Sequence, residues 1–294
     1  MFRLAHFSDP HLGPLPNPST LQLLSKRIFG YLNWTRNRAK TFSDVYLNAL
    51  LADLASEAPD HIALTGDLVN IALPAEIESA GIWLRGLALP ENMSVVPGNH
   101  DAYVPGALNQ AKQVWGPYML GDGASDQPQF PFLRRRGPVA LICCSSSNAT
   151  LPFMATGTFS EKQMEETAKL LQATKDCCRV VLIHHPPFPK ATPHYKRLIG
   201  ADRFRKMIAD NGAELILHGH THIHSDERID GPDRPVPVIG VPSASNGPGH
   251  KKPAGCYNLF SISEDSKKWS INWSQRGVLN AAGKIGPVGK DKQL

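Results

Sequence analysis

The sequence predicts an α/β fold, and three observations support this prediction. Short apolar runs typical of strands alternate along the chain with stretches of helical periodicity. Most of these runs end in polar residues of the kinds that bind metals. The 294 residues are 41% hydrophobic and 19% charged, which is enough to bury a large core. Because no repeat or linker interrupts the pattern, we expect one domain over residues 1–276 and a loose Gly- and Lys-rich tail over 277–294.

The first hundred residues contain three predicted strands, at 2–7, 61–64 and 93–96. A helix is expected over 41–57, where leucines recur at helical spacing after the candidate caps Thr41 and Ser43. A second helix is expected over 75–87, because Pro74 suits the first turn of a helix.

Residues 14–40 form a basic insert between the first strand and the first of these helices. The insert has no Asp or Glu, and it contains Lys26, Arg27, Arg36, Arg38 and Lys40, whereas the whole chain has a net charge of only +5. Its apolar residues at 21, 24, 28 and 32 are spaced as on one face of a helix. We therefore expect a basic amphipathic helix, which either packs by that face or binds an anionic partner such as lipid.

The remaining elements follow a second insert, over residues 102–137, whose length is typical of a functional segment or of one ordered by a partner. Further strands are predicted at 139–144, 179–183 and 214–217. Helices are expected over 160–173, opened by a capping box of Ser160 and Gln163, and over 203–210, closed by Asn211-Gly212. The last three strands, at 236–241, 257–262 and 269–273, are expected to be antiparallel.

Five cysteines without a Cys-x-x-Cys spacing are expected to be buried thiols of a reducing compartment. No run is long enough to cross a bilayer, and the chain begins with a strand rather than a cationic leader. We therefore expect a cytoplasmic protein, peripheral at the inner face of the membrane if the basic insert binds lipid.

Five of the predicted strand ends carry side chains that ligate metals. These candidates are Asp9, His11, Asp67, Asn99, His184, His220 and His222. Each motif alone is more often structural, but five such placements together indicate a metal site. Seven donors suffice for two divalent ions, and their mixture of oxygen and nitrogen suits Mn, Fe or Zn. Asp67 is the candidate bridge, because its strand falls between the other clusters in the chain.

The other histidines have no comparable placement. His6, His61, His194, His218, His224 and His250 are expected to be ordinary core or surface residues, and His185 is intermediate. His220 and His222 are expected to point the same way from an extended turn, with Gly219 providing the backbone freedom.

In chain order, Asp9-x-His11, Gly66-Asp67, Gly98-Asn99-His100-Asp101, His184 and Gly219-His220-x-His222 resemble the signature of the calcineurin-like metallophosphoesterases. The resemblance covers residues 2–273. It implies a four-layer α/β/β/α sandwich with two mixed β-sheets and metals above the strand ends. It also implies that one ion binds Asp9, His11, Asp67 and His222, and the other binds Asp67, Asn99, His184 and His220. His100 would then stabilise or protonate the leaving oxygen, and Asp101 would orient His100.

The family resemblance implies a phosphoester hydrolase with a dinuclear, metal-bridged hydroxide. The His184-His185-Pro186-Pro187 sequence is similar to small bacterial cyclic-nucleotide and glycerophosphodiester phosphodiesterases, so we expect a phosphodiesterase acting on a phosphoester small molecule. The basic insert supports an alternative, a membrane-associated pyrophosphatase of a nucleotide-linked lipid of the UDP-diacylglucosamine type. A second alternative is a non-catalytic scaffold on the same fold. No specific nucleic-acid partner is predicted.

Overall fold

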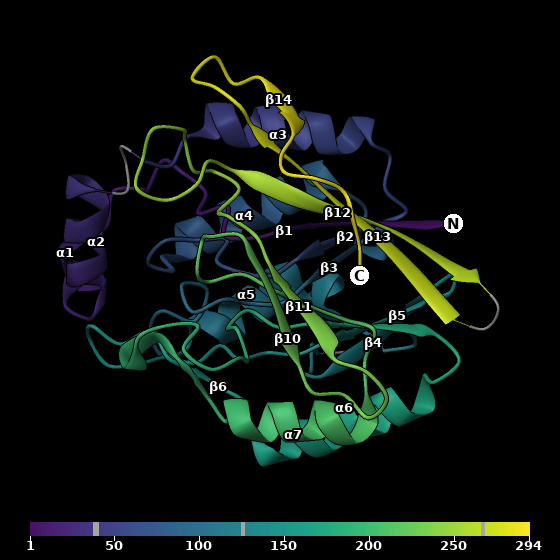
Figure 1. The fold of residues 1–294 in the computed structure, drawn as a ribbon. Helices are drawn as coiled ribbons and strands as arrows, with labels where there is room; N and C mark the ends of the chain where they lie inside the picture. The colour runs from purple at the N-terminus through teal and green to yellow at the C-terminus, as the bar shows by residue number, and fades with distance from the viewer. Residues whose placement is uncertain (38–40, 125–126, 266–267) are drawn as a thin grey trace.

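The fold contains two packed β-sheets, seen as the central strands of Figure 1. The computed structural model describes residues 1–37, 41–124, 127–265 and 268–294. The first sheet runs in the order β14 (Ile285–Pro287), β13 (Lys268–Val278), β12 (Cys256–Asp265), β1 (Phe2–Phe7), β2 (His61–Leu64) and β3 (Met93–Val95), and β15 (Lys292–Gln293) also pairs with β13. β1 is parallel to β2 and antiparallel to β12, so the sheet is mixed.

The second sheet is also mixed. Its order is β10 (Ser225–Ile229), β11 (Val236–Gly240), β9 (Leu215–His218), β7 (Cys178–Leu182), β5 (Val139–Cys143) and β4 (Phe132–Arg136). The four inner strands are parallel and the two edge strands are antiparallel to their neighbours. The expectation of an antiparallel strand at 236–241 was therefore half wrong, because β11 pairs in parallel with β9. A separate pair joins β6 (Gly157–Thr158) to β8 (Leu198–Ile199).

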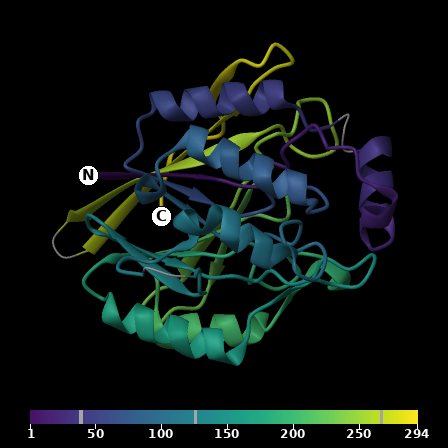
Figure 2. The ribbon, with the colours of Figure 1, turned by 180° about the vertical axis from the view of Figure 1, so that it is seen from behind.

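Helices cover the outer faces of both sheets (Figures 1 and 2). The first sheet is covered by α3 (Asp44–Ser56), α4 (Pro74–Leu87) and α5 (Ala107–Trp115), and the second by α6 (Glu161–Ala173) and α7 (Ala201–Asn211). Single turns occur at η2 (Pro90–Asn92), η3 (Gly116–Met119) and η4 (His194–Lys196). The predicted four-layer α/β/β/α arrangement is confirmed.

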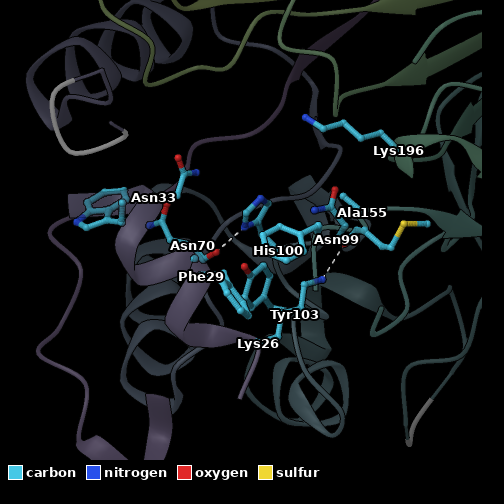
Figure 3. A pocket seen from close by; sticks show the side chains of 13 residues that line it. Lys26, Phe29, Asn33, Asn70, Asn99, His100, Tyr103, Ala155 and Lys196 are labelled. Carbon is cyan, nitrogen blue, oxygen red and sulfur yellow. Dashed lines mark hydrogen bonds between the residues drawn. The ribbon is translucent and has the colours of Figure 1, made fainter. Parts of the chain in front are cut away.

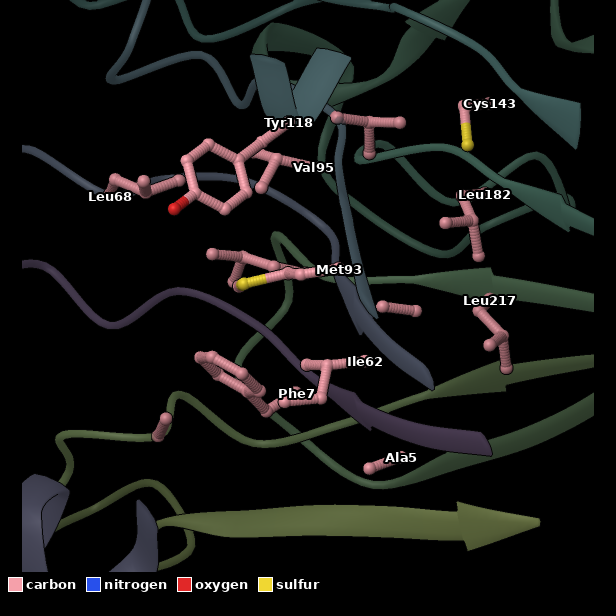
Figure 4. Close-up of a cluster of buried hydrophobic side chains, with 14 of the residues drawn as sticks. Ala5, Phe7, Ile62, Leu68, Met93, Val95, Tyr118, Cys143, Leu182 and Leu217 are labelled. Carbon is pink, nitrogen blue, oxygen red and sulfur yellow. The ribbon is translucent and has the colours of Figure 1, made fainter. Parts of the chain in front are cut away.

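Successive side chains of a strand point to opposite faces of the sheet, so the strands of the second sheet contribute to two separate cores. On β5 and β7, Cys143 and Leu182 face the first sheet, whereas Ile142 and Val181 face the helices α6 and α7. Figure 4 shows part of the larger cluster: Leu182 and Leu217 of the second sheet lie on one side of the first sheet, and Phe7 and Met93 lie on its other side, where Phe7 contacts Trp83 of α4. The five cysteines are free and buried, as expected.

Residues 102–137 are more ordered than the sequence indicated. The helix α5 buries Ala107, Ala111 and Trp115 at spacings of four, a periodicity that the aromatic and polar residues around it obscured. Arg134 is buried on β4 and donates to the carbonyls of Pro90, Met93, Pro117 and Leu120. The described part of this insert is therefore folded rather than a loose connection, and its expected functional role stays a prediction.

Residues 20–36 form a projecting arm of two short helices, α1 (Thr20–Leu23) and α2 (Arg27–Arg36), at the left of Figure 1. The expected apolar stripe does not pack into the core, because Leu21 is 79% exposed and Leu24 is 76% exposed. The arm is held instead by Trp34, its buried residue, and by Lys26 and Arg27, which donate to carbonyls of the main body. Arg38 and Lys40 lie outside the described residues.

The C-terminal tail is not loose, because β14 and β15 pair with β13 at the edge of the first sheet. The glycines and lysines of the tail show no periodic pattern from which these strands could be predicted. Among the helices of the described ranges, none combines the length and the apolar character needed to span a bilayer.

Candidate metal centre

The loops after β1, β2, β3, β7 and β9 meet at one edge of the sandwich. Backbone hydrogen bonds tie them together: Asp9 N–H donates to the Gly66 carbonyl, His11 N–H to that of Asp67, and Gly219 N–H to that of His184. Parallel strands deliver their carboxyl ends to the same edge of a sheet, and the face-to-face packing of the two sheets aligns the two edges. All seven candidate metal ligands lie in these loops.

The backbone of this edge is strained. Nine non-glycine residues in the described ranges have positive φ, and five of them are candidate ligands: Asp9, His11, Asp67, His220 and His222. The φ angles of 67° at His220 and 55° at His222 exclude the extended turn that the sequence suggested. A non-glycine residue in the left-handed region costs of order 1 kcal/mol or more, and such outliers cluster at functional sites.

One group of donors combines the first and last motifs of the chain. Ligand atoms of Asp9, His11, Asp67 and His222 all lie within 4.8 Å of one another and are buried. Nε2 of His11 is 3.3 Å from Nε2 of His222, and the latter is 3.1 Å from Oδ1 of Asp9. Within the described part of the chain, no hydrogen bond reaches this buried Oδ1. A cation between these atoms would satisfy all of them.

A second group lies beside the first and centres on Asn99. Oδ1 of Asn99 is 3.2 Å from Nε2 of His184 and 2.8 Å from Nδ1 of His220. His184, His185 and His220 also present nitrogen atoms within 4.8 Å of one another. The structure therefore brings together every candidate ligand that the sequence indicated, in two adjacent sets.

Asp67 lies between the two sets. Its Oδ2 is 3.8 Å from Nε2 of His11 and 3.4 Å from Nε2 of His184. Its Oδ1 accepts the backbone N–H of His100. A carboxylate in this position can contact a cation in each set, which is the role that its place in the sequence suggested.

The electrostatics of the site favour positive charge. Burial would raise the pKa of Asp67, but His184 and His100 outweigh burial and hold that pKa well below its usual value. Burial likewise opposes the charged form of His184, yet Asp67 raises the pKa of His184 to about 9. Positive charge between these side chains is therefore stabilised, as a divalent ion would require. Two carboxylates with neutral nitrogen and amide donors fit Mn, Fe or Zn.

Hydrogen bonds to backbone carbonyls orient the imidazoles. Nδ1 of His184 donates to the Thr65 carbonyl, Nδ1 of His11 to that of Val69, and Nε2 of His220 to that of Lys196. In each ring the other nitrogen faces the site and could bind a cation there in place of a proton, the usual arrangement of a metal-binding histidine.

His185 differs from these three rings. Its Nε2 donates to the Ala155 carbonyl, and its Nδ1 pairs with the Ser146 hydroxyl at 2.7 Å, so both nitrogens are used. Burial lowers its pKa to about 3, with a further contribution from His184. His185 therefore supports the neighbouring candidate ligands, which agrees with the intermediate role that was expected from the sequence.

Asp101 does not have the position that was expected of it. Its two oxygens accept backbone N–H groups from Asp67, Leu68, Val69 and Gly98. The expected orientation of His100 by Asp101 is not a direct hydrogen bond, because Nδ1 of His100 donates to the carbonyl of Asn70. The sequence could not show this, since any backbone carbonyl can replace a carboxylate as the partner of an imidazole N–H.

Close approach of the loops requires two glycines. A Cβ on Gly98 would lie 2.2 Å from Oδ1 of Asp67, and one on Gly219 would lie 1.9 Å from Oγ of Ser8. Both glycines directly precede candidate ligands, Asn99 and His220.

A cavity of about 280 Å³ opens beside the second set of donors (Figure 3). His100 and Asn99 lie at its centre, and Phe29 of the arm, Tyr103 and Lys196 line its walls. The ring of Tyr103 stacks on His100, with centroids 5.4 Å apart. Sequence reasoning missed Tyr103 and Asn70, although each lies three residues after a motif residue on the same loop.

Comparisons with known proteins agree with this geometry. The family model of the calcineurin-like phosphoesterases matches residues 2–224. The glycerophosphodiester phosphodiesterase GpdQ of Enterobacter lignolyticus (strain SCF1) is 25% identical over 219 residues, which cover 72% of this chain and 64% of GpdQ. The chain thus spans less than two thirds of the length of that relative.

Solved structures show the same fold in larger proteins. The purple acid phosphatase PPD1 from yellow lupin (Lupinus luteus) aligns with a TM-score of 0.58 at 13% identity, over 97% of this chain and 52% of that one. The NAD nucleotidase NadN of Haemophilus influenzae aligns with a TM-score of 0.51 at 12% identity, over 98% of this chain and 54% of that one.

Proposed function

Because the chain belongs to the calcineurin-like phosphoesterases, we propose that it is a phosphodiesterase that depends on two divalent metal ions. The observation that carries this proposal is the place of Asp67, whose Oδ2 lies within 4 Å of histidines from both donor sets. A single-ion site would not need a carboxylate there. One ion would bind Asp9, His11, Asp67 and His222, and the other Asp67, Asn99, His184 and His220.

When bound, two divalent ions supply hydroxide at neutral pH and positive charge for the phosphate. The chain contributes the geometry. Hydrogen bonds from His11, His184 and His220 to backbone carbonyls hold the ligand nitrogens in place. Asp101 fixes the backbone of the Asp67 loop and of Gly98, so that the donors are positioned before substrate binds.

His100 is the proposed general acid. Its Nδ1 donates to the Asn70 carbonyl, and the proposed proton donor to the substrate is Nε2, the other ring nitrogen. His100 lines the cavity beside Asn99, which places the imidazole next to the candidate ligands without making it one. Proton donation to a leaving oxygen contributes about 10²- to 10⁴-fold to a rate.

A diester is favoured over a monoester by the space around His100 and by the relative GpdQ, a glycerophosphodiester phosphodiesterase. A cavity of about 280 Å³ accommodates a substituent on the phosphate. A monoester would leave that volume to water.

The lipid pyrophosphatase alternative loses part of its basis. Nζ of Lys26 donates to Thr150 and Met154, and Arg27 donates to Ile71 and Ala72, so these two charges point toward the protein body. The binding of an anionic partner such as lipid, expected of the basic insert as one alternative, therefore rests on fewer charges. The exposed apolar side chains of the arm still favour a substrate with an apolar part. A non-catalytic scaffold would not require two complete sets of metal donors.

The test is hydrolysis of bis-p-nitrophenyl phosphate and p-nitrophenyl phosphate by chelator-treated protein, before and after addition of Mn²⁺, Fe²⁺ or Zn²⁺. We expect no activity without metal, restoration by at least one ion, and a higher kcat/KM for the diester. His100→Ala should retain the metal and lose most of the turnover on a diester of a poor leaving group. A folded protein that hydrolyses neither ester with any of the three ions would refute the proposal.

A further inference from the structure

Five apolar side chains are exposed on the arm and on the segment 149–154, and two of them, Phe29 and Phe153, line the cavity. We name them the apolar rim: Leu21, Leu24, Phe29, Leu151 and Phe153. Leu21, Leu24, Leu151 and Phe153 are each at least 75% exposed, and Phe29 is 41% exposed. Soluble monomers seldom expose such a group without a binding role, since each side chain loses the free energy of burial.

The rim is assembled from two segments that are far apart in sequence, the arm and residues 149–154. The two segments lie side by side in both ribbon views (Figures 1 and 2). Nζ of Lys26 donates to Oγ1 of Thr150 at 2.6 Å and to the Met154 carbonyl at 2.8 Å. The rings of Phe29 and Phe153 contact each other, with centroids 4.7 Å apart. Leu24 and Leu151 each lie within two residues of these contacts.

Two further features hold the rim in this exposed form. Gly30 packs where a Cβ would meet Ile71 at 2.4 Å, so α2 lies directly against the body beside Phe29. Phe153 has a φ of 65°, a strained conformation for a bulky residue, and it nevertheless presents its ring to solvent. The strained backbone of Phe153 is thus maintained by the structure around it.

The rim is continuous with the cavity that contains His100. Phe29, Phe153 and Met154 line that cavity together with His100 and Asn99 (Figure 3 labels Phe29, Asn99 and His100). A molecule whose phosphate lies at the donor sets can therefore extend past His100 along the apolar side chains of Phe29, Phe153 and Met154, toward the two segments that carry the rest of the rim. A polar substituent would gain no binding free energy from contact with these apolar side chains.

We propose that the apolar rim binds an alkyl or acyl chain carried by the phosphodiester substrate. This proposal rests on the proposed phosphodiesterase function and names its substrate class, a phosphodiester of an amphiphilic alcohol. The inward-facing Lys26 and Arg27 favour a chain of the substrate over an anionic bilayer surface as the occupant, because their charges hold the arm in place.

The experiment compares p-nitrophenyl alkyl phosphates with chains of increasing length, all below their critical micelle concentrations. Each fully buried methylene is worth up to about a four-fold gain in binding. We expect kcat/KM to rise with each added methylene until the chain reaches beyond the rim. Calorimetric binding of n-alkylphosphonates should show the same dependence on chain length, which gives a readout independent of turnover.

The variant Leu21→Ser/Leu24→Ser/Leu151→Ser should flatten the dependence on chain length in both measurements. The matched control is Ile82→Ser/Leu89→Ser, which removes exposed apolar side chains outside the rim and should keep the dependence. The methyl diester serves as the baseline, so loss of activity on this ester reports a failure of the proposed function rather than of the rim.

Three results would overturn the proposal. The first is a kcat/KM that is independent of chain length in the parent protein. The second is an equal loss of chain-length dependence in the control. The third is a rim variant that retains the dependence but no longer binds phosphatidylcholine or phosphatidylglycerol vesicles, which would assign the rim to a bilayer surface.

Discussion

The carboxylate of Asp101 accepts the backbone N–H of Asp67 at 2.9 Å, and it accepts three further backbone N–H groups from Leu68, Val69 and Gly98. It thereby clamps the loop that carries the central carboxylate of the site to the loop that carries Asn99. The motif residue that follows His100 thus organises the candidate metal ligands, through backbone N–H groups rather than through the imidazole.

Asp101→Asn should therefore reduce metal binding as well as activity. The amide has one acceptor oxygen in place of two, and each backbone N–H left buried without a partner costs about 1–3 kcal/mol. We expect a lower melting temperature and less than the parent amount of bound metal by elemental analysis. If Asp101→Asn kept its full metal content and lost only turnover, this result would contradict the role in metal binding and would support an action of Asp101 on His100.

The two adjacent histidines His184 and His185 should differ sharply. Nε2 of His184 faces Asp67 and Asn99, whereas both ring nitrogens of His185 are hydrogen-bonded to Ser146 and Ala155. His184→Gln should lose one ion, and His185→Gln should keep both with a modest loss of stability. Metal content of the two variants, prepared in parallel, tests this. Equal metal loss would show that His185 is a ligand.

The sequence predicted the central strands and the ligand loops well because both have strong local signals. An apolar run that is followed by Asp or His can be recognised without knowledge of the tertiary fold, as for β2 and Asp67. For the arm, the alternative of a packed apolar face was wrong for the opposite reason. Its leucines have the spacing of a packed face, but packing is a tertiary event, and the arm is anchored through Lys26, Arg27 and Trp34.

The positive φ angles of the candidate ligands, and the carbonyls that accept hydrogen bonds from their imidazoles, could not be predicted from the sequence either. Asp and His tolerate the left-handed region but do not require it, so the motifs contain no sign of the strain at His220 or His222. A glycine such as Gly98 is a weak hint of close backbone approach. The sequence cannot say which atom approaches it.

Gly98→Ala should disturb the site although it removes no ligand. The added Cβ would lie 2.2 Å from Oδ1 and 2.4 Å from the backbone nitrogen of Asp67, so the Asp67 loop must shift. We expect metal content and kcat to fall together. Gly86→Ala is the matched control, because a Cβ there meets no atom within 4 Å. Parent-like metal binding by Gly98→Ala would contradict the packing of these two loops.

Asp53 provides a pH-dependent link between α3 and the first sheet. Hydrogen bonds from Arg276 hold the pKa of Asp53 below its usual value, against a smaller opposing effect of burial. The stabilisation is therefore fully present above the unfolded pKa of about 3.9 and is lost as the pH falls through the lower folded value. Asp53→Asn should reduce the free energy of unfolding by about 1.5–3 kcal/mol at pH 7.

Urea unfolding of the parent and Asp53→Asn at several pH values checks this window. The difference between the two proteins should be constant from pH 7 to pH 5 and should shrink below about pH 4. A difference that persists undiminished at low pH would mean that Asp53 acts through packing rather than charge.

The central claim is that Asp67 lies between two metal sites, and counting the bound ions tests it most directly. Equilibrium dialysis of the metal-free protein against Mn²⁺, followed by elemental analysis, gives the number of ions per chain. We predict about two for the parent, and a clear loss for Asp67→Ala, which removes a ligand from both sets. Binding of one ion or none by the parent at saturation would contradict the dinuclear site.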